Sequence, residues 1–172
     1  MEELQKSGLF NAKGNLIFFA HRIIIPYLHN GNITYLRGRY FDENGNTKTD
    51  RSKYIGLGND AIGINTSKRL FNIDVLKKML PEERLYITEG EFDCIVMEGM
   101  GYNAVCIPGV GNMPSERILS KLDAYDIYLC LDTDTAGEGL ATLLITYFSG
   151  RGKVITKVKL PVKDVTDFVN SI

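Results

Sequence analysis

The sequence predicts an α/β protein in which a parallel sheet flanked by helices follows an antiparallel, β-rich (α+β) lobe. After Pro81, short and nearly continuous apolar runs alternate with helical segments, which is typical of parallel strands buried on both faces. Before Pro81, runs rich in β-branched and aromatic residues are separated by turns rich in Asn and Gly, which is typical of hairpins. We therefore expect two parts, residues 1–80 and residues 81–172.

The first part is predicted to form a small antiparallel sheet followed by one short helix. Its expected strands are LIFFAHRIIIPYL, NITYLRGRYF and KYIGL, with turns at residues 29–32 and 42–46. The helix is expected over residues 72–78, with Asn72 as its N-cap.

The second part is predicted to alternate strand and helix up to the C-terminus. Its expected strands are RLYIT, NAVCIP, DIYLCL and KVITKVKLP. Helices are expected over residues 91–100, 114–122 and 136–148, and a last one begins at Thr166. Gly99 or Gly101 closes the first of these helices and Gly150 the third.

Composition excludes several classes of protein. The longest apolar stretch, residues 16–28, is interrupted by His21, Arg22 and Pro26, so we expect no membrane span. The N-terminus is acidic and polar, unlike a signal peptide, and the three cysteines form no CxxC pair. These features predict a cytoplasmic protein with no zinc in this chain.

Charge is divided unevenly along the chain. Residues 1–80 carry twelve Lys and Arg against seven Asp and Glu, whereas residues 81–172 carry eight against fourteen. This asymmetry is consistent with chance distribution over solvated surfaces, but it would also suit a polyanion on the first part and metal ions on the second.

Acidic side chains follow three of the predicted parallel strands. Glu89 follows RLYIT, with Asp93 four residues later; Asp132 and Asp134 follow DIYLCL; and Asp164 follows KVITKVKLP. Ligands of open parallel sheets bind beyond the carboxyl ends of the strands, so these carboxylates should meet at one rim. Carboxylate oxygens are the ligands that Mg²⁺ prefers.

Each acid also has a simpler interpretation. Asp134 or Thr135 could cap the helix that follows, and Asp93 could favour the positive end of its own helix. Asp167 could cap the last helix or face water. If all of these simpler interpretations were correct, acidic residues would follow three strands at one sheet edge by coincidence. We therefore favour a functional site at this edge.

The motifs YITEGEFD, LCLDTDTAGEG and VKDVTDF, in this order and spacing, resemble the TOPRIM domain of primases, topoisomerases and some nucleases. Nearly the whole chain from Gly8 resembles the RNA-polymerase core of bacterial and phage DnaG-type DNA primases. The stretch RIIIPYLHNGNITYLRGRYFDENGN…SKYIGLGN is similar to the basic lobe beside TOPRIM in those enzymes.

The resemblance implies a metal-dependent nucleotidyltransferase that makes short RNA primers on a single-stranded DNA template during DNA replication. It implies catalytic roles for Glu89, Asp132 and Asp134, with Mg²⁺ or Mn²⁺ held by Glu89, Asp93, Asp132, Asp134 and Asp164, and with Asp167 assisting. Glu89 would be a metal ligand or a general acid/base. The nucleic acid and nucleotide would bind Arg37, Arg39, Lys53, Tyr54 and Lys163.

The chain also departs from such primases. It has neither their zinc-ribbon module nor a helicase motif, so we expect a zinc-ribbon module or a replicative helicase to be supplied elsewhere. Two alternatives remain open at this point. A TOPRIM nuclease would use the same acids for hydrolysis, and an inactive replication module would only bind nucleic acid.

Overall fold

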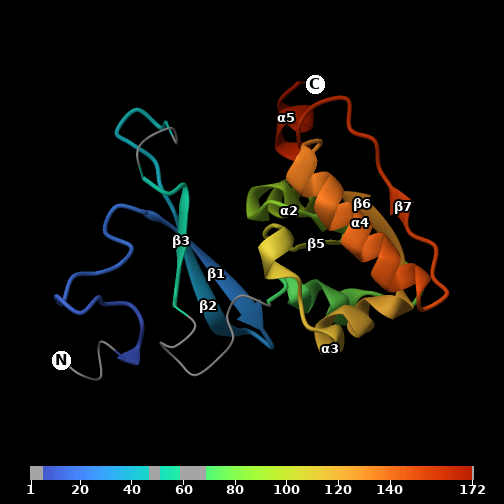
Figure 1. Ribbon diagram of the computed structural model, residues 1–172, viewed down its shortest axis with the longest axis horizontal. Helices are drawn as coiled ribbons and strands as arrows, with labels where there is room; N and C mark the ends of the chain where they lie inside the picture. Colours follow the sequence, from blue (N-terminus) through green and yellow to red (C-terminus); the bar gives the residue numbers. More distant parts are fainter. Residues whose placement is uncertain (1–5, 47–50, 59–68, 172) are drawn as a thin grey trace. The chain divides into compact units, whose positions relative to one another are not determined.

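The computed structural model describes residues 6–46, 51–58 and 69–171. The chain forms two compact units, Met1–Thr66 and Ser67–Ile172 (Figure 1). The division lies earlier in the chain than the boundary after residue 80 that the sequence predicts. The reason is that Ile73, Val75 and Met79 are buried in the core of the second unit.

The first unit contains a three-stranded antiparallel sheet in the order β1-β2-β3, as expected. The strands are β1 (Ile23–His29), β2 (Asn32–Arg39) and β3 (Tyr54–Gly56). Asn30 and Gly31 connect β1 to β2 with φ angles of 55° and 74°. Two consecutive residues with positive φ give the turn whose twist matches that of paired strands, and Asn-Gly is its preferred sequence.

The first strand starts at Ile23, not at Leu16 as the apolar run predicts. Residues 17–20 form turns, in which His21 N donates to Phe18 O at 2.9 Å. Phe18 and His21 are buried against β2 where it carries Gly38; an added Cβ there would lie 2.6 Å from a Phe18 ring carbon. Packing of these side chains therefore overrides the β propensity of the run.

The second unit contains a parallel sheet, as the sequence predicts, and its strands lie in the order β5-β4-β6-β7. Its strands are β4 (Arg84–Thr88), β5 (Ala104–Cys106), β6 (Asp126–Cys130) and β7 (Thr156–Lys157). The central pair β4 and β6 is in register, with Thr88 opposite Cys130. The two central strands therefore end at the same level.

Helices cover both faces of this sheet. The α-helices are α2 (Glu91–Gly99), α3 (Glu116–Leu119), α4 (Thr135–Ser149) and α5 (Val165–Asn170). Shorter 3₁₀ segments are η2 (Ile73–Lys78), η3 (Val110–Asn112) and η4 (Ser120–Ala124). None of the helices in the described ranges has the length and hydropathy of a membrane-spanning segment.

The two faces belong to two apolar clusters. Leu85 and Ile87 of β4 pack with Leu140, Leu144 and Phe148 of α4 in the larger cluster. On the other face, the smaller cluster joins α2, α5 and the sheet; its buried members are Cys94, Met97, Ala104, Cys106, Cys130 and Val165. The three cysteines are therefore core residues.

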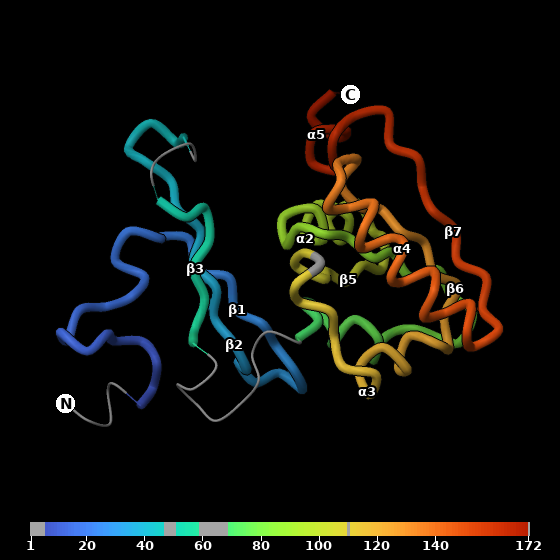
Figure 2. Tube along the Cα trace, in the orientation of Figure 1, coloured from blue at the N-terminus to red at the C-terminus, as the bar shows by residue number. Residues whose placement is uncertain are grey.

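Some predicted elements are shorter in the structure. Strand β7 has two residues instead of the nine predicted, and α3 begins at Glu116, two residues after Pro114. Asn72 does not cap η2 with its side chain; its amide instead donates to Ala104 O of β5 at 2.9 Å. The segment after β7 then runs as a long extended path to α5 (Figure 2).

Candidate active site at the carboxyl ends of β4 and β6

The register of the central strands sets where the acidic residues lie. Glu89 is the first residue after β4, and Asp132 is the second residue after β6. Because Thr88 is opposite Cys130, both acids leave the sheet at the same edge. The geometry thus brings together the first two strand ends that the sequence singled out.

Glu89 is the most strongly perturbed carboxyl group of this edge. Burial, followed by the charges of Asp132 and Asp134, raises the pKa of Glu89 to about 7. Its Oε2 is buried and makes no hydrogen bond among the described residues. Gly109, with φ 86°, lies beside this carboxyl group, since a Cβ there would be 4.0 Å from its Oε1.

This raised pKa predicts an unusual dependence of stability on pH. The native protein holds the Glu89 proton up to about pH 7, whereas the unfolded chain loses it near 4.5, so the native state binds more protons between these values. The free energy of unfolding should therefore fall as pH rises through this window. Glu89→Gln should raise the free energy of unfolding by about 1 kcal/mol at about pH 8 without metal, after discounting for solvent screening.

Urea unfolding in the presence of a chelator, at about pH 5 and about pH 8, measures this effect. The gain from Glu89→Gln should be near zero at the lower pH. An equal gain at both pH values would contradict a raised pKa for Glu89.

Asp132 lies against the start of α4 and beside a lysine. The main chain of Asp132 approaches Gly137 so closely that a Cβ on Gly137 would be 2.0 Å from Asp132 O. Lys163 Nζ lies 3.4 Å from Asp132 Oδ2. Burial raises the pKa of Asp132, while the Lys163 charge acts in the opposite direction.

Asp134 and Asp164 are both helix caps. Asp134 Oδ1 accepts hydrogen bonds from Ala136 N at 3.0 Å and Gly137 N at 3.1 Å. Asp164 Oδ1 accepts one from Asp167 N at 2.8 Å. The capping interpretation of Asp134 is confirmed, and it occupies one carboxylate oxygen. The Oδ2 of Asp134 makes no hydrogen bond or ion pair within the described ranges, so the cap leaves it available to a ligand.

Asp93 lies in the first turn of α2 and holds α5. Its Oδ1 accepts hydrogen bonds from Thr166 N at 2.9 Å and from Thr166 Oγ1 at 2.6 Å. Its Oδ2 approaches Gly90, where a Cβ would be 2.3 Å away. Burial raises the pKa of Asp93 and the Thr166 hydrogen bonds lower it. The side chain is buried, at 8% exposure, so much of its hydrogen-bonding capacity serves to attach α5.

These side chains fit a hard divalent cation in their chemistry. Glu89 offers a buried oxygen that has no partner among the residues that the structure describes, and the carboxylates around it repel one another. Within the described ranges, no three His, Cys, Asp or Glu side chains are grouped closely enough to enclose an ion by themselves. Mg²⁺ commonly uses one or two carboxylates together with water and substrate phosphates, so an open arrangement suits it.

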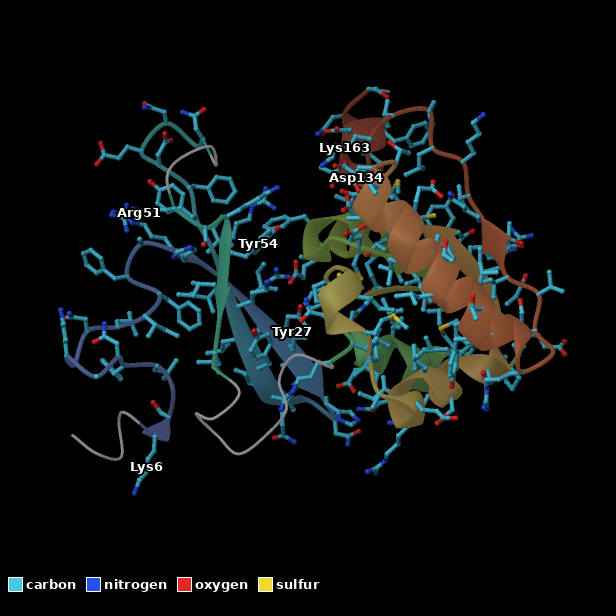
Figure 3. The ribbon with its side chains drawn as sticks, viewed as in Figure 1. Lys6, Tyr27, Arg51, Tyr54, Asp134 and Lys163 are labelled. Atoms are coloured by element: carbon cyan, nitrogen blue, oxygen red, sulfur yellow. The ribbon has the colours of Figure 1, made fainter. Side chains whose placement is uncertain are left out.

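The basic residues of the first unit gather around Tyr54. Arg39 is opposite Tyr54 and Arg37 opposite Gly56 in the β2–β3 register. The Arg37 guanidinium carbon lies 4.2 Å from the centre of the Tyr54 ring, and Arg39 Nη1 donates to the Tyr54 hydroxyl. Lys53 Nζ lies 5.9 Å from the same ring. These four side chains therefore form one cluster, with Arg37 and Arg39 on β2, Tyr54 on β3 and Lys53 directly before β3. Tyr54 is labelled in Figure 3.

Two contributors to the site were not assigned these roles from the sequence. Thr166 has no motif that links it to Asp93, which is 73 residues away. Gly137, inside α4, makes room for the Asp132 main chain, since a Cβ there would be 2.0 Å from Asp132 O. Gly137 had a local cue, a glycine inside a helix, whereas the Thr166 contact follows from tertiary packing alone.

A family model described as Toprim-like matches residues 86–169. The matched segment lies within the second unit, which is similar to Toprim-like domains over this range. The chain is also 30% identical over 145 residues to a DNA primase of Chlamydia pneumoniae. That match covers 81% of this chain and 23% of the relative, so the chain spans about a quarter of the curated relative that it matches.

Two solved structures share the fold of both units. The zinc-binding and RNA polymerase domains of the Aquifex aeolicus primase match with a TM-score of 0.74 and 22% identity, over 98% of this chain and 42% of that one. A DnaG primase catalytic domain bound to single-stranded DNA matches with a TM-score of 0.73 and 19% identity, over 98% and 53%. These findings confirm the resemblance and the fold class expected from the sequence: a Toprim-like domain preceded by a β-rich lobe.

Proposed function

We propose that this chain is a DNA primase catalytic core that makes short RNA primers on single-stranded DNA by metal-dependent nucleotidyl transfer. The observation that carries the proposal is the Glu89 carboxyl group in the Toprim-like domain. Its pKa is raised to about 7 by burial and by Asp132 and Asp134, and its Oε2 has no hydrogen-bond partner among the described residues. The similarity to the Chlamydia pneumoniae DNA primase over 81% of this chain supports the same function.

The reaction joins two nucleotides. A 3′-hydroxyl attacks the α-phosphate of an incoming nucleoside triphosphate, a new phosphodiester bond forms, and pyrophosphate leaves. Without metal, the Glu89 carboxyl group has a pKa near 7, which suits a group that accepts the hydroxyl proton. We propose that Glu89 either accepts this proton or serves as a metal ligand.

We assign the binding of Mg²⁺ or Mn²⁺ to Asp132, Asp134 and Glu89, with Asp164 and Asp93 as further ligands. Asp134 would use its Oδ2, since its Oδ1 caps α4. Asp93 contributes least as a ligand, because its Oδ1 is engaged by Thr166. A bound divalent ion supplies stabilisation of the attacking and leaving oxygens in such a displacement.

The Arg37, Arg39, Lys53 and Tyr54 cluster would bind the template or the triphosphate. Arginine contacts phosphate through two parallel hydrogen bonds, and lysine contacts it as a point charge. The Tyr54 ring already stacks with Arg37 at 4.2 Å, so a base would have to use its other face. We propose that Lys163, which lies in the Toprim-like domain, also binds the template or the triphosphate.

The proposed partners are single-stranded DNA, nucleoside triphosphates, and a zinc-ribbon module or replicative helicase. The Aquifex aeolicus structure pairs a zinc-binding domain with the RNA polymerase domain, and this chain matches 42% of it. We propose that a zinc-binding module likewise acts together with this chain. We also propose that the protein works in the cytoplasm.

Priming on single-stranded DNA tests the proposal. The protein is incubated with single-stranded DNA, labelled nucleoside triphosphates and Mg²⁺ or Mn²⁺, and the products are separated on a denaturing gel. Short labelled products whose sequence follows the template are expected. Shortening of labelled DNA would support a Toprim nuclease instead, and DNA binding without any product under either metal would support an inactive module.

A further inference from the structure

Lys163 occupies a central position among the carboxylates of the Toprim-like domain. Its Nζ lies 3.4 Å from Asp132 Oδ2 and 3.9 Å from Asp164 Oδ2. It lies next to the start of α4, where Asp134 is labelled in Figure 3. The positive charge thus sits beside the oxygen atoms that a divalent ion would need.

The main chain of Lys163 is fixed on both sides. Thr133 N, between the two aspartates of the β6 end, donates to Lys163 O at 2.9 Å. The next residue, Asp164, caps α5, and α5 is attached to α2 through Thr166 and Asp93. The lysine backbone therefore cannot leave the site without breaking these hydrogen bonds.

The Lys163 side chain, in contrast, is largely exposed. It is 56% exposed, whereas the Asp132 side chain is 19% exposed. A lysine has a flexible four-carbon stem, so its ammonium group can leave one carboxylate and reach another anion while its backbone stays in place. A partly exposed ion pair of this kind is worth only about 1 kcal/mol or less, so such a movement costs little.

We propose that Lys163 is the resident counter-cation of Asp132, and that its ammonium group competes with the divalent ion for this carboxylate. When the ion binds, the ammonium is repelled and turns to a phosphate group of the bound nucleotide. This inference rests on the proposed function, since it uses the same metal site. In this proposal the Lys163 ammonium group moves between the Asp132 carboxylate and a nucleotide phosphate, and does not keep one fixed contact with the nucleotide.

Binding of Mn²⁺ without nucleotide tests the exchange. Titration calorimetry compares the wild-type protein, Lys163→Met and Lys163→Arg at low ionic strength. Lys163→Met should bind Mn²⁺ about threefold to fivefold more tightly, which corresponds to the loss of one partly exposed ion pair. Lys163→Arg keeps the charge and should bind Mn²⁺ like the wild type.

Lys159→Met is the matched control, because Lys159 is an exposed lysine of the same segment and its loss changes net charge equally. It should change Mn²⁺ affinity by less than about twofold, since distant exposed charges are screened. Thermal unfolding of each variant verifies that it is folded.

Unchanged or weaker Mn²⁺ binding by folded Lys163→Met would overturn the proposal. The priming assay separates this failure from that of the proposed function. If the wild-type protein binds Mn²⁺ and makes primers while Lys163→Met binds Mn²⁺ with the wild-type affinity, only the proposed exchange is contradicted. Absence of Mn²⁺ binding in every variant contradicts both.

Discussion

Replacing Asp132 by Asn is expected to lower the rate of primer synthesis by at least about a hundredfold. Asp132 is half-buried at the end of β6, beside Glu89 and Lys163. The amide has nearly the same shape as the carboxylate but no charge, so it binds a divalent ion poorly and does not pair with Lys163. Initial rates of labelled primer formation measure the effect.

Asp126→Asn provides the matched control. Asp126 is exposed at the start of β6, whereas Asp132 follows the end of the same strand. The control makes the same chemical change at the opposite edge of the sheet and should keep the wild-type rate within about twofold. An equal loss of activity in both variants, or a retained rate in Asp132→Asn, would argue against a catalytic role for the β6 end.

Gly137→Ala is expected to destabilise the protein by about 3 kcal/mol. In most exposed helices, Gly→Ala is stabilising by up to about 1 kcal/mol. Here the new Cβ would lie 2.0 Å from Asp132 O and 2.9 Å from Asp132 C, and both are backbone atoms. Either α4 or the segment that carries Asp132 and Asp134 has to shift, so primer synthesis should also fall.

Gly99→Ala isolates the effect of close packing, because Gly99 is helical and has nothing within 4 Å of an added Cβ. The free energy of unfolding in urea should be equal to or above that of the wild type in this variant. A Gly137→Ala protein of wild-type stability would show that α4 does not need the close approach to Asp132.

The fold was predictable because its pattern is local. The apolar runs RLYIT and DIYLCL became β4 and β6 almost residue for residue, since strands buried on both faces contain few polar residues. The run KVITKVKLP was much less predictive. Only Thr156 and Lys157 pair with β6, at the edge of the sheet, where little packing holds a strand in place.

The candidate site was predictable in part for a similar reason. The carboxyl ends of neighbouring parallel strands share an edge, so Glu89 and Asp132 had to approach each other once the strands were assigned. The hydrogen bonds from Thr166 to Asp93 and the ion pair of Lys163 with Asp132 depend on how α5 packs against α2 and on the path after β7. Such contacts between distant residues follow from tertiary packing, and a single sequence has no local signal for them.

The most direct measurement of the central claim is the position of Mn²⁺ in crystals of the protein soaked with the ion, located by its anomalous scattering. We expect a peak within about 2.3 Å of carboxylate oxygens of Glu89 and Asp132, with Asp134 adjacent. Lys163 Nζ should then lie farther from Asp132 than its present 3.4 Å. An ordered Mn²⁺ bound elsewhere, with Glu89 and Asp132 free of metal, would contradict the proposed active site.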